Sequence, residues 1–315
     1  MRALLCPASL KGVLSAGVAA AALARGAREA GVDALELPVA DGGEGTAEVL
    51  QAALGGEWRE ARVSDPFGRP VLARWLSLPD GRAIVEAAAA IGLPLLAAEE
   101  RDPLRASSRG LGELVLAALA SSPASLVVAL GGSATVDGGA GLREVVATLP
   151  VPTVALCDVR TSLADAARLF GPQKGASEED IAVLERRLDS MDELRPYASL
   201  PGAGAAGGLG AALAALGAEL VPGAATVLDL VGFDEHLSGC DLVVTGEGQV
   251  DATTAEGKVP GEVVARCLLA GARCVVFGGR VSVEIEGAET VALSGDPARA
   301  EADLVELGVV LGARG

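Results

Sequence analysis

The chain has 315 residues, half of them hydrophobic, with only 2% aromatic residues and 42 glycines. A core of this composition is built mainly from alanine, valine and leucine, and the length suits one large or two ordinary domains. The net charge of −17 argues against nucleic acid and anionic membrane surfaces as partners, because both bind through lysine and arginine, but it leaves room for a local basic pocket that holds a small anion.

The five cysteines and the single histidine, His236, show neither metal-ligand spacing nor a disulfide framework. An odd number of thiols is typical of a reducing compartment, so we expect a cytoplasmic protein. Residues 114–136 and 196–218 are long and uncharged, but proline, serine and glycine interrupt them, which argues against membrane spans. Lys11 likewise interrupts the first apolar run, so we expect no leader peptide.

Taken in chain order, the first 63 residues alternate between predicted strands and helices. Strands are expected at residues 2–6, 34–38 and 58–63, and helices are expected after Ser15, a good N-cap residue, and after Thr46. This βαβαβ order predicts a parallel sheet covered by helices.

A turn signal at residues 65–69, DPFGR, interrupts this alternation. The next two strands, at 71–78 and 82–86, are separated only by Pro-Asp-Gly and predict an antiparallel hairpin. Because hairpins replace crossovers here, we place a domain boundary at this point. Further elements are expected in the order helix 107–120, strands 126–130 and 153–157, an amphipathic helix at 177–191, and an alanine-rich helix that opens within 201–210.

The alternation of strand and helix returns after residue 240. A strand at 242–245 enters a loop that ends at Lys258, and a helix at 259–269, strands at 273–277 and 290–293 and a final helix follow. Because this C-terminal part is too small to stand alone, we expect it to share one sheet with the N-terminal part. The predicted domains are therefore residues 1–66 with 239–315, and an inserted domain of residues 67–238.

Five loops rich in glycine and charge follow predicted strands. They are PASLKG at 7–12, ADGGEG at 40–45, GGSATVDGG at 131–139, CDVR at 157–160 and GEGQVD at 246–251. Ligands of open parallel sheets bind beyond the carboxyl ends of the strands, so we expect these loops to line a common cleft between the two domains. The alternative is that they are independent turns.

The absence of several catalytic motifs limits the reaction types that the sequence could support. It has no Walker P-loop, no HRD or DFG and no GxSxG, and its one histidine argues against histidine-based nucleophilic catalysis. The acids, lysines and glycine loops that remain are suited to metal-assisted phosphoryl transfer, in which positioning and charge neutralisation supply most of the catalysis. An alternative function is a nicotinamide-dependent oxidoreductase, because residues 202–207 match the dinucleotide-binding pattern GxGxxG and Glu219 could bind the ribose. No strand is predicted before this match, however, so the sequence favours phosphoryl transfer over dinucleotide binding.

Eight segments, in this order, resemble the type I bacterial glycerate kinases. They are LKGVLSA, ADGGEGT, DPFGR, ASSRGLGEL, GGSATVDGGAG, FGPQKGA, PGAGAAGGLG, and DLVVTGEGQVD followed by GK. The resemblance implies ATP-dependent phosphorylation of D-glycerate with Mg²⁺, usually at the 2-hydroxyl. It also implies a two-domain α/β fold, with a Rossmann- or flavodoxin-like parallel-sheet domain built from both chain ends and an inserted mixed α/β domain.

The sequence departs from the family pattern at several polar positions. Ala8 stands where an acid is usual, Val136 and Thr253 stand where amides are usual, and Thr161 and Ser162 replace Asn-Pro. Loss of these groups leaves two alternatives open. One is a kinase for a different small hydroxy acid, and the other is a catalytically weak homologue that binds a nucleotide or a hydroxy acid.

The resemblance and the loops together give candidate roles. Asp41 or Asp251 would accept the hydroxyl proton, and Lys11 or Lys258 would neutralise charge on the transferred group. The metal candidates are Asp158 and Glu247, because Mg²⁺ needs few carboxylates. The candidates for binding substrate or phosphate are Ser9, Gly42, Gly43, Arg69, Arg109, Gly131, Gly132, Ser133, Thr135 and Lys174.

Among these binding candidates, the backbone amides of residues 131–135 would cradle phosphate oxygens. Arg69 or Arg109 would pair with the substrate carboxylate in a bidentate manner. We expect a monomer or homodimer whose partner is the small molecule D-glycerate, with no nucleic acid and no membrane.

Overall fold

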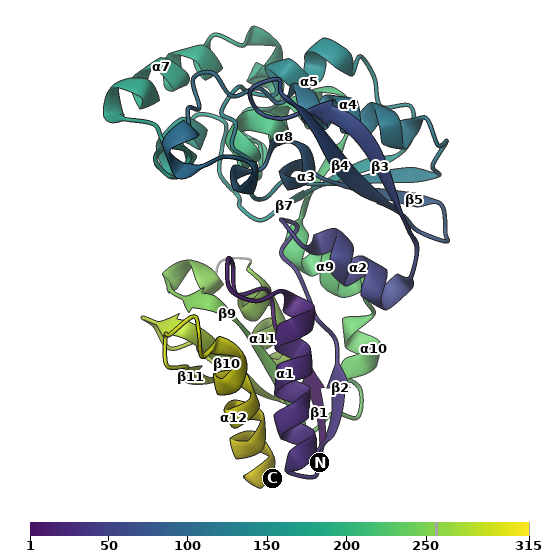
Figure 1. The fold of residues 1–315 in the computed structure, drawn as a ribbon, viewed down its shortest axis with the longest axis vertical. Coiled ribbons are helices and arrows are strands. Elements are labelled where there is room, and N and C mark those ends of the chain that lie inside the picture. Colours follow the sequence, from purple (N-terminus) through teal and green to yellow (C-terminus); the bar gives the residue numbers. More distant parts are fainter. Residues whose placement is uncertain (256–257, 315) are drawn as a thin grey trace. The chain divides into compact units, whose positions relative to one another are not determined.

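The computed structural model describes residues 1–255 and 258–314. The chain divides into two compact units, each with its own sheet (Figure 1). Unit 1 consists of Met1–Asp41, Glu48–Ala53 and Ala224–Gly315, and unit 2 consists of Gly42–Ala47 and Leu54–Gly223. The predicted boundaries at 66/67 and 238/239 remain a proposal about which part of the chain is the insertion.

Unit 1 is built on a five-stranded sheet in which every pair of neighbours is parallel. The order across the sheet is β11-β10-β9-β1-β2, which confirms that both chain ends share one sheet. Counted along the chain within the unit, this is the flavodoxin-like order 2-1-3-4-5. The strands are β1 (Arg2–Leu5), β2 (Asp33–Glu36), β9 (Leu242–Val250), β10 (Arg273–Val281) and β11 (Glu289–Ala292).

Helices cover both faces of this sheet. On one face α1 (Ala16–Glu29) and α12 (Ala300–Ala313) run side by side and bury an apolar cluster that includes Leu5, Val244 and Phe277 (Figure 1). On the other face α11 (Val259–Ala270) packs against β9 and β10, with Cys267 beside Cys274. The remaining helices assigned largely to this unit are α2 (Thr46–Leu54), α9 (Gly223–Leu230) and α10 (Phe233–Leu237).

Unit 2 contains a six-stranded mixed sheet in the order β3-β4-β5-β6-β7-β8. Its strands are β3 (Glu57–Ser64), β4 (Pro70–Ser77), β5 (Arg82–Glu86), β6 (Ser125–Ala129), β7 (Thr153–Cys157) and β8 (Glu219–Pro222). The first three strands pair antiparallel and the rest pair parallel. The predicted hairpin of β4 and β5 is thereby confirmed.

The third predicted strand lies in a different sheet from the one expected, so that prediction was wrong. The strand predicted at 58–63 exists as β3, but it pairs antiparallel with β4 in the sheet of unit 2 and does not join the parallel sheet of unit 1. The physical reason is the short turn that follows, in which Asp65 accepts the N–H groups of Phe67 and Arg69, both at 2.8 Å. A turn this short can join only antiparallel neighbours, because parallel strands need a long crossover.

The helices of unit 2 form two groups, of which one packs on the apolar residues of the sheet and the other forms an apolar cluster of its own. They are α3 (Ala87–Ile91), α4 (Arg109–Leu119), α5 (Ala140–Val145), α6 (Ala166–Phe170), α7 (Glu178–Asp189) and α8 (Ala205–Ala215). Short 3₁₀ segments lie at Leu93–Leu95, Ala98–Glu100, Pro172–Lys174 and Asp192–Tyr197, and in unit 1 at Ala252–Ala255. Six short elements were not expected from the sequence, namely β8, α3, α5, α6, α9 and α10. In the described part of the chain, no helix has the length and apolar character needed to cross a membrane.

Candidate active site

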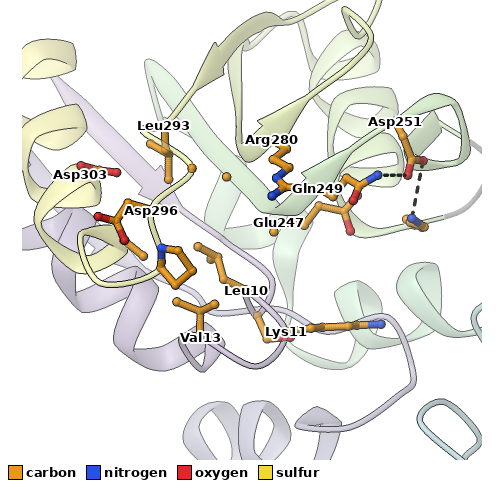
Figure 2. Close-up of a pocket in the computed structure, with 17 residues that line it drawn as sticks. Leu10, Lys11, Val13, Glu247, Gln249, Asp251, Arg280, Leu293, Asp296 and Asp303 are labelled. Atoms are coloured by element: carbon orange, nitrogen blue, oxygen red, sulfur yellow. Dashed lines mark hydrogen bonds and ion pairs between the residues drawn. The ribbon is translucent and has the colours of Figure 1, made fainter. Parts of the chain in front are cut away.

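A pocket of about 470 Å³ opens at the carboxyl ends of the strands of unit 1 (Figure 2). It lies at the switch point of the sheet, where the chain leaves β1 toward one edge and leaves β9 toward the other, which is the position at which doubly wound sheets bind ligands. The lining residues are Ser9, Leu10, Lys11, Val13, Glu247, Gly248, Gln249, Asp251, Lys258, Gly279, Arg280, Leu293, Gly295, Asp296, Pro297, Ala300 and Asp303.

The side chains at the centre of the pocket come from a strand where the sequence analysis expected a loop. β9 continues through residues 246–250 and pairs with β10, with Gln249 opposite Arg280. Gly246 makes this pairing possible, because a Cβ there would clash with the carbonyl oxygen of Phe277. Since alternate residues of a strand share a face, Glu247 and Gln249 project to the same side, with a glycine between them.

Glu247 is the half-buried acid of the pocket. Burial raises the pKa of its carboxyl above the usual range, and a hydrogen bond from Thr254 and the charge of Lys258 oppose this shift. The Thr254 hydroxyl donates to Glu247 Oε1 at 2.8 Å and accepts the backbone N–H of Asp251 at 3.0 Å. Thr254 is fully buried, so a single hydroxyl ties together two residues that were predicted to act in the chemistry.

Each of the two candidate bases has a lysine beside it. Lys11 Nζ lies 3.4 Å from Asp41 Oδ2, and Lys258 Nζ lies 3.9 Å from Asp251 Oδ1. Asp251 also accepts a hydrogen bond from Gln249 at 3.3 Å. Lys258, Asp41 and Lys11 all act electrostatically on Glu247, and Asp251 is linked to it through Thr254. Unit 1 therefore gathers the four predicted catalytic residues around one half-buried acid. Ser9 lines the same pocket.

The other candidates belong to unit 2, where two glycine loops meet. The Gly131 N–H donates to the Gly42 carbonyl at 3.4 Å, and a Cβ at Gly131 would lie 2.6 Å from Gly43 Cα. Only glycine permits this backbone approach. Asp158 lies beside Gly131 and belongs to this loop cluster, whereas the other predicted metal ligand, Glu247, belongs to unit 1.

Lys174 holds the loop of residues 131–135 from inside unit 2. Its ammonium is buried and donates to Ser133 Oγ at 3.1 Å and to the Thr135 carbonyl at 2.7 Å. Burial lowers the pKa of Lys174 to about 7, against the opposing influence of Asp137 and Asp158. The lysine therefore shapes the loop, and its predicted contact with a phosphate stays a prediction.

The two candidate arginines for the substrate carboxylate are already engaged with acids of unit 2. Arg69 donates to Asp65 at 2.5 Å and to Glu100 at 2.8 Å. Arg109, in α4, donates to Glu113 at 3.0 Å and to Glu144 at 3.2 Å. A substrate carboxylate would have to displace one of these partners, so their assignment stays a prediction.

Two functional candidates were missed by the sequence analysis, Thr254 and Arg280. Thr254 stands three residues after Asp251, a spacing that lets a hydroxyl bond the backbone of a tight turn, and this was the available signal. Arg280 lies in the extension of β10 beyond Gly278-Gly279, where the sequence pattern gave no sign that the strand continued.

Comparison with known proteins decides the family. The model of the glycerate kinase family matches residues 3–149 and 143–295. The chain belongs to the glycerate kinase family. Glycerate 2-kinase of Escherichia coli K12 is 42% identical, with 82% of this chain and 80% of that protein covered. Glycerate kinase of Bacillus subtilis 168 is 37% identical, with the same shares covered.

A solved glycerate kinase structure has the same fold. The crystal structure assigned as glycerate kinase 2 of Salmonella typhimurium LT2 is 32% identical and superposes with a TM-score of 0.82, covering 100% of this chain and 98% of that one. This confirms the two-domain α/β fold class. Dinucleotide binding would require a strand before the GxGxxG match. The structure describes this segment in full, and it forms a 3₁₀ helix, Asp192–Tyr197, in place of a strand.

Proposed function

We propose that this member of the glycerate kinase family transfers the γ-phosphoryl group of ATP to D-glycerate, at the 2-hydroxyl, giving 2-phosphoglycerate. The observation that carries the proposal is the set of acids and lysines around Glu247 at the switch point of the flavodoxin-like sheet. The name of the Escherichia coli relative, glycerate 2-kinase, supports the position of transfer. Phosphoryl transfer asks a protein mainly for positioning and for neutralisation of charge, which these residues supply.

In this proposal the 2-hydroxyl oxygen of glycerate attacks the γ-phosphorus in line. The bond from the γ-phosphorus to the β–γ bridging oxygen breaks, ADP leaves, and the hydroxyl proton passes to Asp41 or Asp251. Lys11 and Lys258, which lie within 4.0 Å of these acids, neutralise charge on the transferred group. The choice between the two bases stays open. Asp41→Asn and Asp251→Asn decide it, since the base should lose more than about tenfold in kcat.

The carboxylates of the pocket fit Mg²⁺. Among the described residues no cluster of three or more metal-ligating side chains exists, but Mg²⁺ is normally held by one or two carboxylates together with substrate phosphates. Glu247 is a half-buried acid whose charged form is disfavoured by desolvation, and a cation would offset that cost. Glu247 would hold the ion, with Asp158 as the alternative from unit 2. When bound, Mg²⁺ would neutralise phosphate charge.

Unit 2 contributes backbone donors in this proposal. The amides of residues 131–135, in the loop that Lys174 holds from inside, would bind phosphate oxygens. The glycerate carboxylate would pair with Arg69 or Arg109. These assignments rest on the family resemblance of the motifs.

The departures from the family pattern leave the pocket of unit 1 largely intact. Ala8 donates its backbone N–H to the Gly246 carbonyl at 2.9 Å, a contact that does not depend on its side chain. Val136 is fully buried in an apolar cluster of unit 2. Ser162 donates to Asp165 at 2.7 Å. The side chain of Thr253 lies outside what the structure describes. These placements favour a working kinase over the binding-only homologue.

The test is a coupled assay of the purified chain with D-glycerate, ATP and Mg²⁺, in which phosphorus NMR identifies the product. We expect 2-phosphoglycerate. ADP formation only with another hydroxy acid would show a changed substrate, and no ADP with any acid would favour the binding-only homologue. We further propose a cytoplasmic monomer or homodimer without a nucleic-acid partner, on the basis of the free cysteines and the acidic charge.

A further inference from the structure

The pocket of unit 1 has two chemically different ends. One end carries the charged residues Lys11, Glu247, Asp251 and Lys258. The other end is lined by the apolar side chains of Leu10, Val13, Leu293, Pro297 and Ala300, with Asp296 and Asp303 on the same side. Figure 2 shows Leu10, Val13 and Leu293 on one side of the pocket and Asp251 on the other, with Glu247 and Arg280 between them.

Arg280 stands where the two ends meet. Its side chain extends from the end of β10 into the pocket (Figure 2). Within residues 1–255 and 258–314, no carboxylate lies within ion-pair distance of its guanidinium, whereas Arg273 at the start of the same strand pairs with Glu289 at 3.0 Å. In a chain of net charge −17, a guanidinium left without an acid in a pocket points to an anionic ligand.

The backbone beneath Arg280 leaves room for that ligand. Gly279 lies against Gly248, and a Cβ at Gly279 would come within 2.8 Å of the Gly248 carbonyl oxygen. A Cβ at Gly248 would in turn meet nothing closer than Leu10 Cα at 3.7 Å. The middle of the pocket therefore has a floor of glycine backbone, which lets a ligand lie close to the strands.

The size and layout of the pocket distinguish between the two substrates of the proposed kinase. Its volume of about 470 Å³ falls in the range of roughly 300–1,000 Å³ typical of pockets for drug-sized ligands, and a three-carbon acid would fill only a small part of it. A ligand with one flat apolar end and one polyanionic end fits the two ends of the pocket. Asp296, at the apolar end, offers a carboxylate acceptor for sugar hydroxyls.

We infer that this pocket is the nucleotide site, with the base and ribose at the end formed by Leu10, Val13, Leu293 and Asp296, and with Arg280 bound to the polyphosphate. The inference rests on the proposed function and adds to it the unit that carries ATP and a binding residue outside the sequence motifs. The γ-phosphate would then lie toward Glu247 and the two lysines. Arg280 is a binding residue in this arrangement and the acids carry the chemistry.

The experiment measures nucleotide binding directly, without turnover. The full chain is titrated calorimetrically with the non-hydrolysable ATP analogue AMPPNP and Mg²⁺, and steady-state assays give KM for each substrate. We expect Arg280→Gln to raise the Kd of AMPPNP about tenfold or more and to leave KM for D-glycerate within about twofold. The matched control is Arg273→Gln, on the same strand but outside the pocket, which should leave both values unchanged.

A second variant tests the apolar end. Val13 is 38% exposed, so Val13→Glu should fold, and the added carboxylate should weaken AMPPNP and adenosine alike. If both variants keep the wild-type Kd and instead raise KM for D-glycerate, the pocket binds the acid and the inference fails while the proposed kinase stands. If the wild-type chain binds no AMPPNP, the proposed function fails together with the inference.

Discussion

Glu247 shows at the scale of one residue how the fold prepares a charge for a ligand. The side chain is half-buried, and in the described residues its hydrogen-bond donor is Thr254. The hydrogen bond favours the charged form while burial disfavours it. Thr254 therefore acts as a positioning residue, because it fixes the orientation of Glu247 and also accepts the N–H of Asp251.

Thr254→Val keeps the shape of the side chain but removes the hydroxyl. We expect kcat to fall about tenfold or more, because Glu247 and the Asp251 N–H both lose their partner. The hydrogen bond lowers the pKa of Glu247, so its loss should move the acid limb of the pH–rate profile to higher pH. Thr254→Ser should retain both the rate and the profile. An unchanged acid limb in the valine variant would contradict the assigned role.

Lys174 gives a second residue-scale prediction, on stability. Its folded-state pKa of about 7 lies below the unfolded value of 10.5, so the folded state binds fewer protons than the unfolded state between these values. The free energy of unfolding should therefore rise with pH, by about 2 kcal/mol between about pH 7 and about pH 9. Well below pH 7, Lys174 is charged in the folded state, and the free energy of unfolding is lowered by the full cost of burying that charge.

The measurement compares wild type with Lys174→Met by denaturant unfolding at both pH values. Trp58 and Trp75 lie on β3 and β4, so tryptophan fluorescence reports on unit 2, which contains the lysine. The methionine variant should lose the pH-dependent gain whatever its absolute stability. Equal pH slopes in the two proteins would mean that Lys174 stays charged when folded.

At the scale of elements, α1 and α12 of unit 1 pack closely against each other. Gly26 faces the backbone of α12 so closely that a Cβ would clash with the Val305 carbonyl oxygen. Gly308 approaches α1 in the same way, since its Cβ would come within 2.7 Å of the Ala27 nitrogen. The two glycines let the helices pack backbone to backbone over the sheet.

Gly26→Ala should lower the free energy of unfolding by about 1–3 kcal/mol, because the added methyl forces the two helices apart. The matched control is Gly17→Ala in the same helix, where a Cβ would meet no atom within 4 Å. That variant should gain up to about 1 kcal/mol from helix propensity. Circular dichroism during thermal unfolding measures both, and equal destabilisation by the two changes would contradict the packing reason.

At the scale of the whole molecule, net charge dominates the electrostatics. The many ion pairs are mostly on the surface, and each such pair is worth about 0–1 kcal/mol, which salt reduces. The net charge of −17 destabilises the folded state, because like charges repel one another in a compact chain, and salt weakens this repulsion.

We expect the repulsion to outweigh the pairs, so that raising NaCl from about 10 to about 300 mM raises the melting temperature by a few degrees at neutral pH. Scanning calorimetry measures the shift. KCl should give the same response, which would exclude binding of one particular cation. A melting temperature that falls with salt would show that the surface ion pairs contribute more than repulsion costs.

The sequence by itself determined what is local. Hydrophobic periodicity located most strands and helices, and motif order indicated the family and the residues Lys11, Asp41, Glu247, Asp251 and Lys258 that unit 1 gathers. These follow from short-range preferences and from the chemistry that each side chain carries in any fold.

Only the tertiary structure decided the strand pairing, the burial and the charge pairing, because these depend on residues that are distant in the chain. β3 joined the second sheet and β9 ran on through residues 246–250, because strand pairing is settled by the neighbour and not by the strand. Thr254 bonds Glu247, Arg280 lines the pocket, and Lys174 turns inward to hold a loop. Burial and charge pairing are properties of surroundings that residues far apart in the chain create together.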